Sequence, residues 1–138
     1  HWLKLIKPTL EQGIWVISDR FADSSIVYQG YAGDIELDTV LNIHNVVLGE
    51  VWPDLTIILD LPPELGLERS NKRDTANNSK DTRFEKRELQ FHKLLREGFQ
   101  YLQSKSPDRI CVVDGTKTIV EVELEVFSII KKRFVGLM

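Results

Sequence analysis

The residues of this chain that are best suited to chemistry form one cluster in its N-terminal part. An acid, a base, hydroxyls, a phenol and an amide occur within about three helical turns. They are Asp19, Arg20, Ser24, Ser25, Tyr28 and Gln29. An apolar run at residues 14–18 comes directly before them and predicts a buried parallel strand. Ligands of open α/β sheets bind beyond the carboxyl ends of strands, so this cluster is a candidate binding site.

Alternating strands and helices are expected to position the cluster. Apolar runs predict strands at residues 14–18, 55–59 and 110–113, and helical periodicity predicts helices at residues 1–12, 22–29, 36–49, 65–69, 84–103 and 119–134. Pro8 predicts a kink in the first helix or a start shortly after residue 1. Residues 70–82 are polar and predict a mobile surface loop. This order predicts an α/β fold, a parallel sheet with helices on both faces, in one domain over residues 1–138.

The bulk composition narrows the class of protein. A length of 138 residues, with 42% hydrophobic residues and a net charge of −3, suits one globular domain and does not indicate an extended nucleic-acid surface. No run reaches the roughly 20 apolar residues needed to cross a membrane. The single cysteine, Cys111, excludes an internal disulfide and fits a reducing compartment. His44 and His92 lack partner ligands at metal spacing, so no metal site is predicted from them.

Two expected parts of a nucleotide-binding α/β fold are missing from the sequence. There is no G-x-x-x-x-G-K-[ST] phosphate loop, and three strands make a thin sheet for so many helices. The chain also starts at His1 without an initiator methionine. We therefore expect the first strands of the fold to be missing from this chain.

The cluster and the segments after it resemble the bacterial thymidylate kinases, a branch of the P-loop nucleoside-monophosphate kinases. The run Val16-Ile17-Ser18-Asp19-Arg20-Phe21, followed by Ser24-Ser25 and Tyr28-Gln29-Gly30-Tyr31, is similar to the family's D-R-[YFH] and S-x-x-A-Y-Q-G segments, with Val27 where alanine is usual. Further agreement follows in order and spacing at Pro53-Asp54-Leu55-Thr56, Leu59-Asp60-Leu61-Pro62-Pro63-Glu64, Arg83-Phe84-Glu85 and Val113-Asp114-Gly115. The family's P-loop strand, helix and second strand would precede His1. The resemblance therefore covers the C-terminal two-thirds of such an enzyme.

The resemblance implies a transfer of phosphate from ATP, with Mg²⁺, to dTMP in a cytoplasmic homodimer. Arg20 would clamp the acceptor phosphate, and Asp19 would orient Arg20 or the magnesium shell. Ser25 would face the thymine edge, with further hydrogen bonds from Ser24 and Gln29. Tyr28 would exclude a 2′-hydroxyl, and Phe21 would stack on the base. The alternatives are an Arg–Asp surface pair for Arg20, a strand-terminal cap for Asp19, a helix cap at Ser24, and core packing of the two aromatic rings.

The resemblance also implies a donor side. Arg73 and Arg83 would act as catalytic residues from a lid over residues 70–83, and Arg69 would approach ATP. Gly115 and Thr116 would belong to the loop that cradles adenine. The alternatives are a solvated charged loop and an ordinary strand-to-helix turn. Without a P-loop lysine, the chain alone is expected to be inactive. Two other functions stay open, a related deoxynucleotide or deoxynucleoside kinase and a non-catalytic nucleotide-binding remnant.

Overall fold

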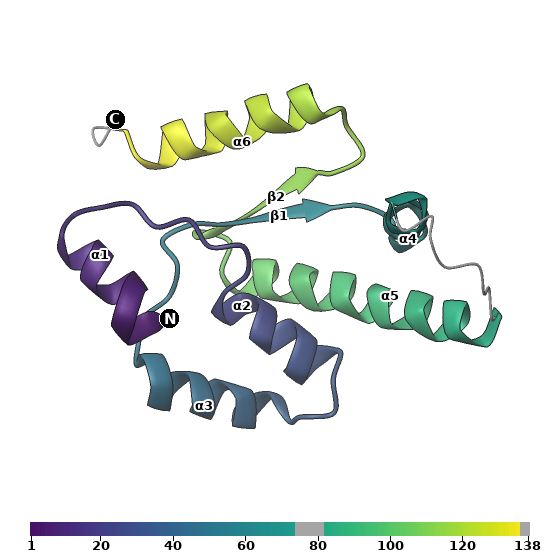
Figure 1. Ribbon diagram of the computed structural model, residues 1–138, viewed down its shortest axis with the longest axis horizontal. Coiled ribbons are helices and arrows are strands. Elements are labelled where there is room, and N and C mark those ends of the chain that lie inside the picture. The colour runs from purple at the N-terminus through teal and green to yellow at the C-terminus, as the bar shows by residue number, and fades with distance from the viewer. Residues whose placement is uncertain (74–81, 136–138) are drawn as a thin grey trace. The chain divides into compact units, whose positions relative to one another are not determined.

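The protein is described by a computed structural model that covers residues 1–73 and 82–135, with side chains at residues 1–70 and 88–135 (Figure 1). Its contacts concentrate in two compact units, His1–Trp52 and Pro53–Met138. The organisation of residues 1–138 as a single domain stays a prediction.

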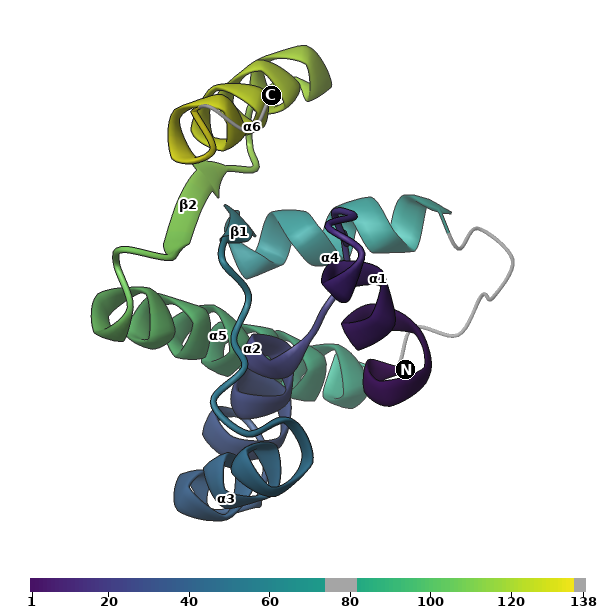
Figure 2. The same cartoon turned by 90° about the vertical axis from the view of Figure 1, so that its left-hand side faces the viewer.

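The second unit is built on a two-stranded parallel sheet. Strand β1 (Thr56–Asp60) pairs with β2 (Ile110–Asp114) in a register that places Thr56 beside Ile110 and Asp60 beside Asp114. Helices α5 (Thr82–Lys105) and α6 (Ile119–Arg133) cover opposite faces of this sheet (Figures 1 and 2). Helix α4 (Pro63–Arg73) connects the sheet to the segment before α5. The predicted arrangement of a parallel sheet between two helical layers is confirmed.

The core of this unit forms where α5 meets β2. Ile110 and Val113 of β2 are 1% and 0% exposed, and Leu95 of α5 is 5% exposed. Helix α6 begins at a capping box in which Thr118 Oγ1 accepts from the Glu121 backbone N–H, while the Glu121 carboxylate accepts from the Thr118 backbone N–H. The parallel register brings the carboxyl ends of both strands to one edge, so Asp60 and Asp114 lie side by side.

The first unit is helical. It contains a π-helical turn η1 followed by α1, then α2 followed by a second π-helical turn η2, and finally α3 (Trp2–Ile6, Lys7–Glu11, Ala22–Ser25, Ile26–Tyr31 and Leu37–Leu48). Pro8 is the second residue of α1 and follows directly after η1, so it lies where the π-helical turn changes to an α-helix. The helices predicted at residues 1–12, 22–29 and 36–49 are confirmed.

The strand predicted at residues 14–18 is wrong. In the described part of the chain the only sheet is β1–β2, and residues 14–18 are irregular. A strand needs a neighbouring backbone to pair its N–H and C=O groups, and no described segment supplies one here. The predicted burial of this segment is also wrong, since the side chains of Ile14, Trp15 and Ile17 are 53%, 49% and 93% exposed.

The bounds of the predicted lid are also corrected. Helix α4 continues to Arg73 and α5 begins at Thr82, so both ends of the loop predicted over residues 70–83 are helical. Residues 74–81 lie outside the described part. Within the part that is described, no helix combines the length and the apolar character that a membrane crossing requires.

Candidate functional site

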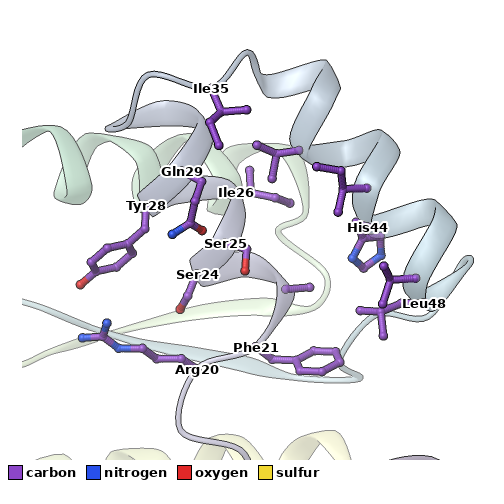
Figure 3. A pocket seen from close by; sticks show the side chains of 14 residues that line it. Arg20, Phe21, Ser24, Ser25, Ile26, Tyr28, Gln29, Ile35, His44 and Leu48 are labelled. Atoms are coloured by element: carbon purple, nitrogen blue, oxygen red, sulfur yellow. The ribbon is translucent and has the colours of Figure 1, made fainter. Parts of the chain in front are cut away.

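A cavity of about 610 Å³ opens in the first unit between the η2 region and α3. Five residues of the predicted cluster supply one wall of it, Arg20, Ser24, Ser25, Tyr28 and Gln29, and the predicted site residue Phe21 also lines the cavity. Helix α3 supplies the opposite wall with the side chains of Val40, Ile43, His44, Val47 and Leu48. The structure therefore brings six of the predicted site residues together around one space (Figure 3).

Arg20 has an unusual backbone conformation. Its φ of 68° makes it the one non-glycine residue with a positive φ in the described part of the chain. The left-handed region costs a residue with a Cβ about 1–2 kcal/mol, so glycine would be the favoured residue here for stability. The Ser18 hydroxyl donates to the Arg20 carbonyl oxygen at 2.8 Å and closes this turn. A strained arginine beside a cavity points to a function of its side chain.

The wall formed by the predicted cluster has a polar side. Figure 3 shows the Arg20 side chain pointing toward Tyr28, with Ser24 and Gln29 on the same side of the helix. The Arg20 guanidinium lies 4.8 Å from the centre of the Tyr28 ring. No described carboxylate or carbonyl pairs with this guanidinium, and Arg20 is an exposed residue of the cavity lining. Five donors in a planar fork suit a phosphate or a carboxylate.

The other side of the cavity is apolar and includes a residue that was assigned no site role. Phe21 points away from Arg20, toward Leu48 and His44 (Figure 3). His44 is 7% exposed and stacks on Trp52, with ring centroids 4.0 Å apart. Of His44 the sequence indicated only that it lacks partner ligands at metal spacing, so its place in the wall of a cavity was not predicted. A flat aromatic ligand can be held by such a wall.

The π-helical turn η2 sets the positions of Tyr28 and Gln29. The Ala32 N–H donates to the Val27 carbonyl at 2.8 Å, the i→i+5 bond that widens this turn. A Cβ at Gly33 would lie 2.5 Å from the Gln29 carbonyl oxygen and 2.7 Å from that of Tyr28. Only glycine fits this close approach without a shift of the backbone. Gly33 therefore allows the chain to turn directly under the two site residues.

Asp19 is placed differently from its neighbours. It is exposed and does not line the cavity, and the structure has no Asp19–Arg20 ion pair. Within residues 1–70 and 88–135, no three metal-ligating side chains gather. The carboxylates at the two strand ends already have partners, because Asp60 is bound by Arg96 and Asp114 by Thr116. Asp19 follows an irregular segment and not a strand, and among these three acids it is the one whose carboxylate stays open to a hard cation.

The strand ends of the second unit carry an ion pair that the sequence analysis missed. Arg96 on α5 holds the Asp60 carboxylate with two parallel hydrogen bonds of 2.7 Å, from Nε and Nη2. The Arg96 side chain is 37% exposed and the Asp60 side chain 23% exposed. The hydrogen bonds to Asp60 raise the pKa of Arg96 above its ordinary value. Beside this pair, the pKa of Glu64 is lowered by hydrogen bonds from its backbone N–H and from Lys93. The spacing of these residues along the chain gave no local signal for the pair.

The β2–α6 loop is tied to the other elements of its unit. The Gly115 N–H donates to the Asp60 carbonyl at 2.7 Å, and Arg69 Nη1 donates to the Gly115 carbonyl at 2.9 Å. Thr116 donates to the Asp114 carboxylate from its hydroxyl at 2.7 Å and from its N–H at 2.9 Å, which lowers the pKa of Asp114. A Cβ at Gly115 would lie 3.1 Å from the Asp60 carbonyl oxygen. The structure thus brings together Arg69, Gly115 and Thr116, three of the five residues predicted for the donor side.

Of the three predicted catalytic residues, Asp19, Arg73 and Arg83, the two arginines of the predicted lid are the least defined. Arg73 is the last residue of α4 and Arg83 the second residue of α5. Their side chains lie outside the described part of the chain, so their roles stay predictions.

Comparison with known proteins identifies close relatives. The sequence profile of the family described as thymidylate kinase matches residues 1–126. The thymidylate kinase of Maridesulfovibrio salexigens is 40% identical over 138 residues, and that of Nitratidesulfovibrio vulgaris is 38% identical over 133 residues. These alignments cover 99% and 95% of this chain.

A solved structure agrees with the sequence relatives. The crystal structure of thymidylate kinase from Ehrlichia chaffeensis superimposes with a TM-score of 0.68 at 30% identity, and the match covers 95% of this chain and 57% of that one. The chain spans 64% and 62% of the length of the two curated relatives. The similarity therefore extends over nearly the whole chain but over about three-fifths of each relative.

Proposed function

The chain belongs to the thymidylate kinase family, and we propose that it carries the acceptor site of an enzyme that transfers phosphate from ATP to dTMP, forming dTDP. The observation that carries this proposal is the cavity walled by Arg20, Ser24, Ser25, Tyr28 and Gln29 in a chain of this family. It supplies a cation for a phosphate, hydroxyls and an amide for a base edge, and an apolar wall for a ring.

Each residue of the polar side has a role in this proposal. Arg20 binds the 5′-phosphate of dTMP through two parallel charge-assisted hydrogen bonds. Ser24, Ser25 and Gln29 offer hydrogen bonds to the thymine edge, and Phe21 offers a face for the base. Tyr28 lies beside Arg20 and fills the space that a ribose 2′-hydroxyl would need.

The donor nucleotide is proposed to use the other polar loop. Gly115 and Thr116 present backbone groups for adenine, and Arg69 holds this loop through the Gly115 carbonyl. Arg73 and Arg83 are proposed to neutralise charge on the transferred phosphoryl group. Mg²⁺ would neutralise the phosphate oxygens of ATP when it is bound, and Asp19 is the residue proposed to orient its shell.

The proposal extends to assembly and location. A homodimer is supported by apolar side chains that face solvent and do not line the cavity, since Val46 of α3 is 87% exposed and Leu3 and Leu5 of η1 are 73% and 58% exposed. Light scattering of the protein measures this directly. A cytoplasmic location is supported by the free thiol of Cys111, which fits a reducing compartment.

The test uses the full-length protein for turnover and the 138-residue chain for binding. Coupled ADP release is measured with dTMP, dUMP, dCMP, dAMP and thymidine, each with MgATP. We expect the highest kcat/KM with dTMP, and dTMP binding without ATP turnover for the 138-residue chain. Faster turnover of dCMP, dAMP or thymidine would assign a different acceptor. Binding of dTMP without turnover by the full-length protein would favour a non-catalytic nucleotide-binding protein.

A further inference from the structure

We propose that Ser18 and Tyr28 are positioning residues that hold Arg20 in its phosphate-binding conformation before the nucleotide arrives. This inference rests on the proposed function and adds two roles to it. Arg20 is fixed at both ends, at its backbone by Ser18 and at its guanidinium by the Tyr28 ring.

The backbone end is fixed by a short polar contact. A left-handed φ of 68° is unfavourable for arginine, so the turn needs a local bond to persist. The Ser18 hydroxyl supplies it by donating to the Arg20 carbonyl oxygen at 2.8 Å. This conformation sends the Arg20 side chain toward η2, whereas the adjacent Phe21 points toward α3 (Figure 3). Ser18 thereby decides on which side of the cavity the cation lies.

The guanidinium end is fixed by an aromatic face. The Arg20 Cζ atom lies 4.8 Å from the Tyr28 ring centroid, within the roughly 6 Å at which a cation over a ring is attracted by its negative face. A contact of this kind is electrostatic and does not use the N–H groups of the guanidinium as hydrogen-bond donors to the protein. The ring therefore orders a long, flexible side chain without consuming the donors that a phosphate needs. Ordering before binding lowers the entropic cost of capturing the ligand.

A residue that positions Arg20 and a residue that contacts the sugar should affect ligand binding differently. A residue that acts through Arg20 affects dTMP, which carries the phosphate, and leaves thymidine unaffected. A residue that contacts the deoxyribose affects both ligands equally. The ratio of the Kd for thymidine to the Kd for dTMP separates the two roles.

The experiment measures this ratio by calorimetry on the full-length protein. We expect Tyr28→Leu to lower the ratio about two- to fivefold, the range that corresponds to an exposed cation–π contact. Tyr28→Phe keeps the ring and should keep the ratio. Tyr101→Leu is the matched control, because it removes a comparable contact with Lys105, 5.4 Å from the Tyr101 ring in the second unit, and should leave the ratio unchanged.

Ser18 gives an independent variant in case Tyr28→Leu fails to fold. Ser18→Ala removes the hydroxyl and should lower the same ratio about two- to tenfold, whereas Ser18→Thr should restore it. An NMR measurement adds a direct reporter, because the ring current of Tyr28 should shift the Arg20 side-chain protons in the wild type and in Tyr28→Phe but not in Tyr28→Leu.

The outcomes separate this inference from the proposed function. A ratio that is unchanged or increased in both Tyr28→Leu and Ser18→Ala, or equal losses for dTMP and thymidine, would overturn the positioning role. A wild-type protein that binds thymidine as tightly as dTMP would instead overturn the phosphate-binding role of Arg20 itself.

Discussion

Two regions of this molecule use the same residue types at the ends of apolar segments, but they use them differently. In the second unit, Asp60 and Arg96 are paired through two 2.7 Å bonds, and the Asp114 carboxylate accepts from Thr116. In the first unit, the Arg20 guanidinium lies over a ring and no described acid or carbonyl binds it. A charge with an internal partner stabilises the fold, whereas a charge held by an aromatic face remains available to a ligand. Residue type alone does not separate an arginine that is paired within the fold from one that is available to a ligand.

The largest effect that can test this contrast is expected at Arg20. Arg20→Gln removes a charge-assisted hydrogen-bonded clamp and should weaken dTMP binding about ten- to a hundredfold, or about 1.5–3 kcal/mol. Thymidine binding should change far less, because thymidine has no phosphate. Calorimetry with both ligands measures the difference.

Arg96→Gln is the matched control for this variant. It removes an arginine with an internal partner and should leave the Kd for dTMP within about twofold, a change of about 0.4 kcal/mol. Equal losses of dTMP affinity in the two variants would erase the distinction between the regions.

The second effect is expected in folding stability, where the Asp60–Arg96 pair should matter more than Arg20. Asp60→Asn and Arg96→Gln each leave one partner of a half-buried, bidentate pair without its counter-charge. Each should lower the free energy of unfolding by about 1–2 kcal/mol, above the usual range of an exposed pair because of the two parallel bonds. Denaturant unfolding followed by circular dichroism measures this loss.

The double variant sharpens the result. If the two residues act as a pair, the double variant Asp60→Asn/Arg96→Gln should lower the free energy of unfolding little more than either single change. Arg20→Gln should lower the free energy of unfolding by less than about 1 kcal/mol, because this variant loses only the contact with Tyr28. Strictly additive losses at Asp60 and Arg96 would contradict the pairing.

The two regions also differ in how far the sequence predicts them. The run from Asp19 to Gln29 keeps its site residues within a few turns, so a local pattern sufficed to find six residues that line the cavity. The Asp60–Arg96 pair joins residues 36 positions apart, and only the packing of α5 on the sheet brings them together. The positive φ of Arg20 and the approach of Tyr28 to it likewise depend on three-dimensional geometry.

The fold shows the same division between local and long-range information. Helix α3 and strands β1 and β2 follow from periodicity and apolar runs, and each lies within two residues of its predicted bounds. Residues 14–18 have the composition of a strand, but a strand forms only beside another backbone, and the described residues do not supply one. The apolar run was therefore identified correctly, while its pairing could not be deduced from local sequence. Ile119 likewise fits the apolar stripe of α6 but is 86% exposed.

The smallest effect concerns the pKa of Asp114 at the start of the β2–α6 loop. Hydrogen bonds from the Thr116 hydroxyl and backbone N–H lower the pKa of Asp114 from its ordinary value of 3.8. A carboxyl group with a lowered folded-state pKa contributes stability above its unfolded pKa, and this contribution is lost as the pH falls through the folded-state value. Thr116→Val removes the hydroxyl bond and leaves the N–H bond, so the pKa of Asp114 should rise part of the way toward 3.8. Carboxyl-carbon NMR titration measures the change.

A neighbouring threonine, Thr118, provides the control for this effect. Thr118 donates its hydroxyl to Glu121 and lowers the pKa of that group in the same way. Thr118→Val should therefore raise the pKa of Glu121 and leave that of Asp114 in place. An Asp114 pKa that responds to Thr118→Val and not to Thr116→Val would show that the loop is held by α6 and not by its own threonine. If Thr116 sets this pKa, the Asp114 carboxylate has its hydrogen-bond donors within the β2–α6 loop itself, whereas no described acid or carbonyl binds the Arg20 guanidinium.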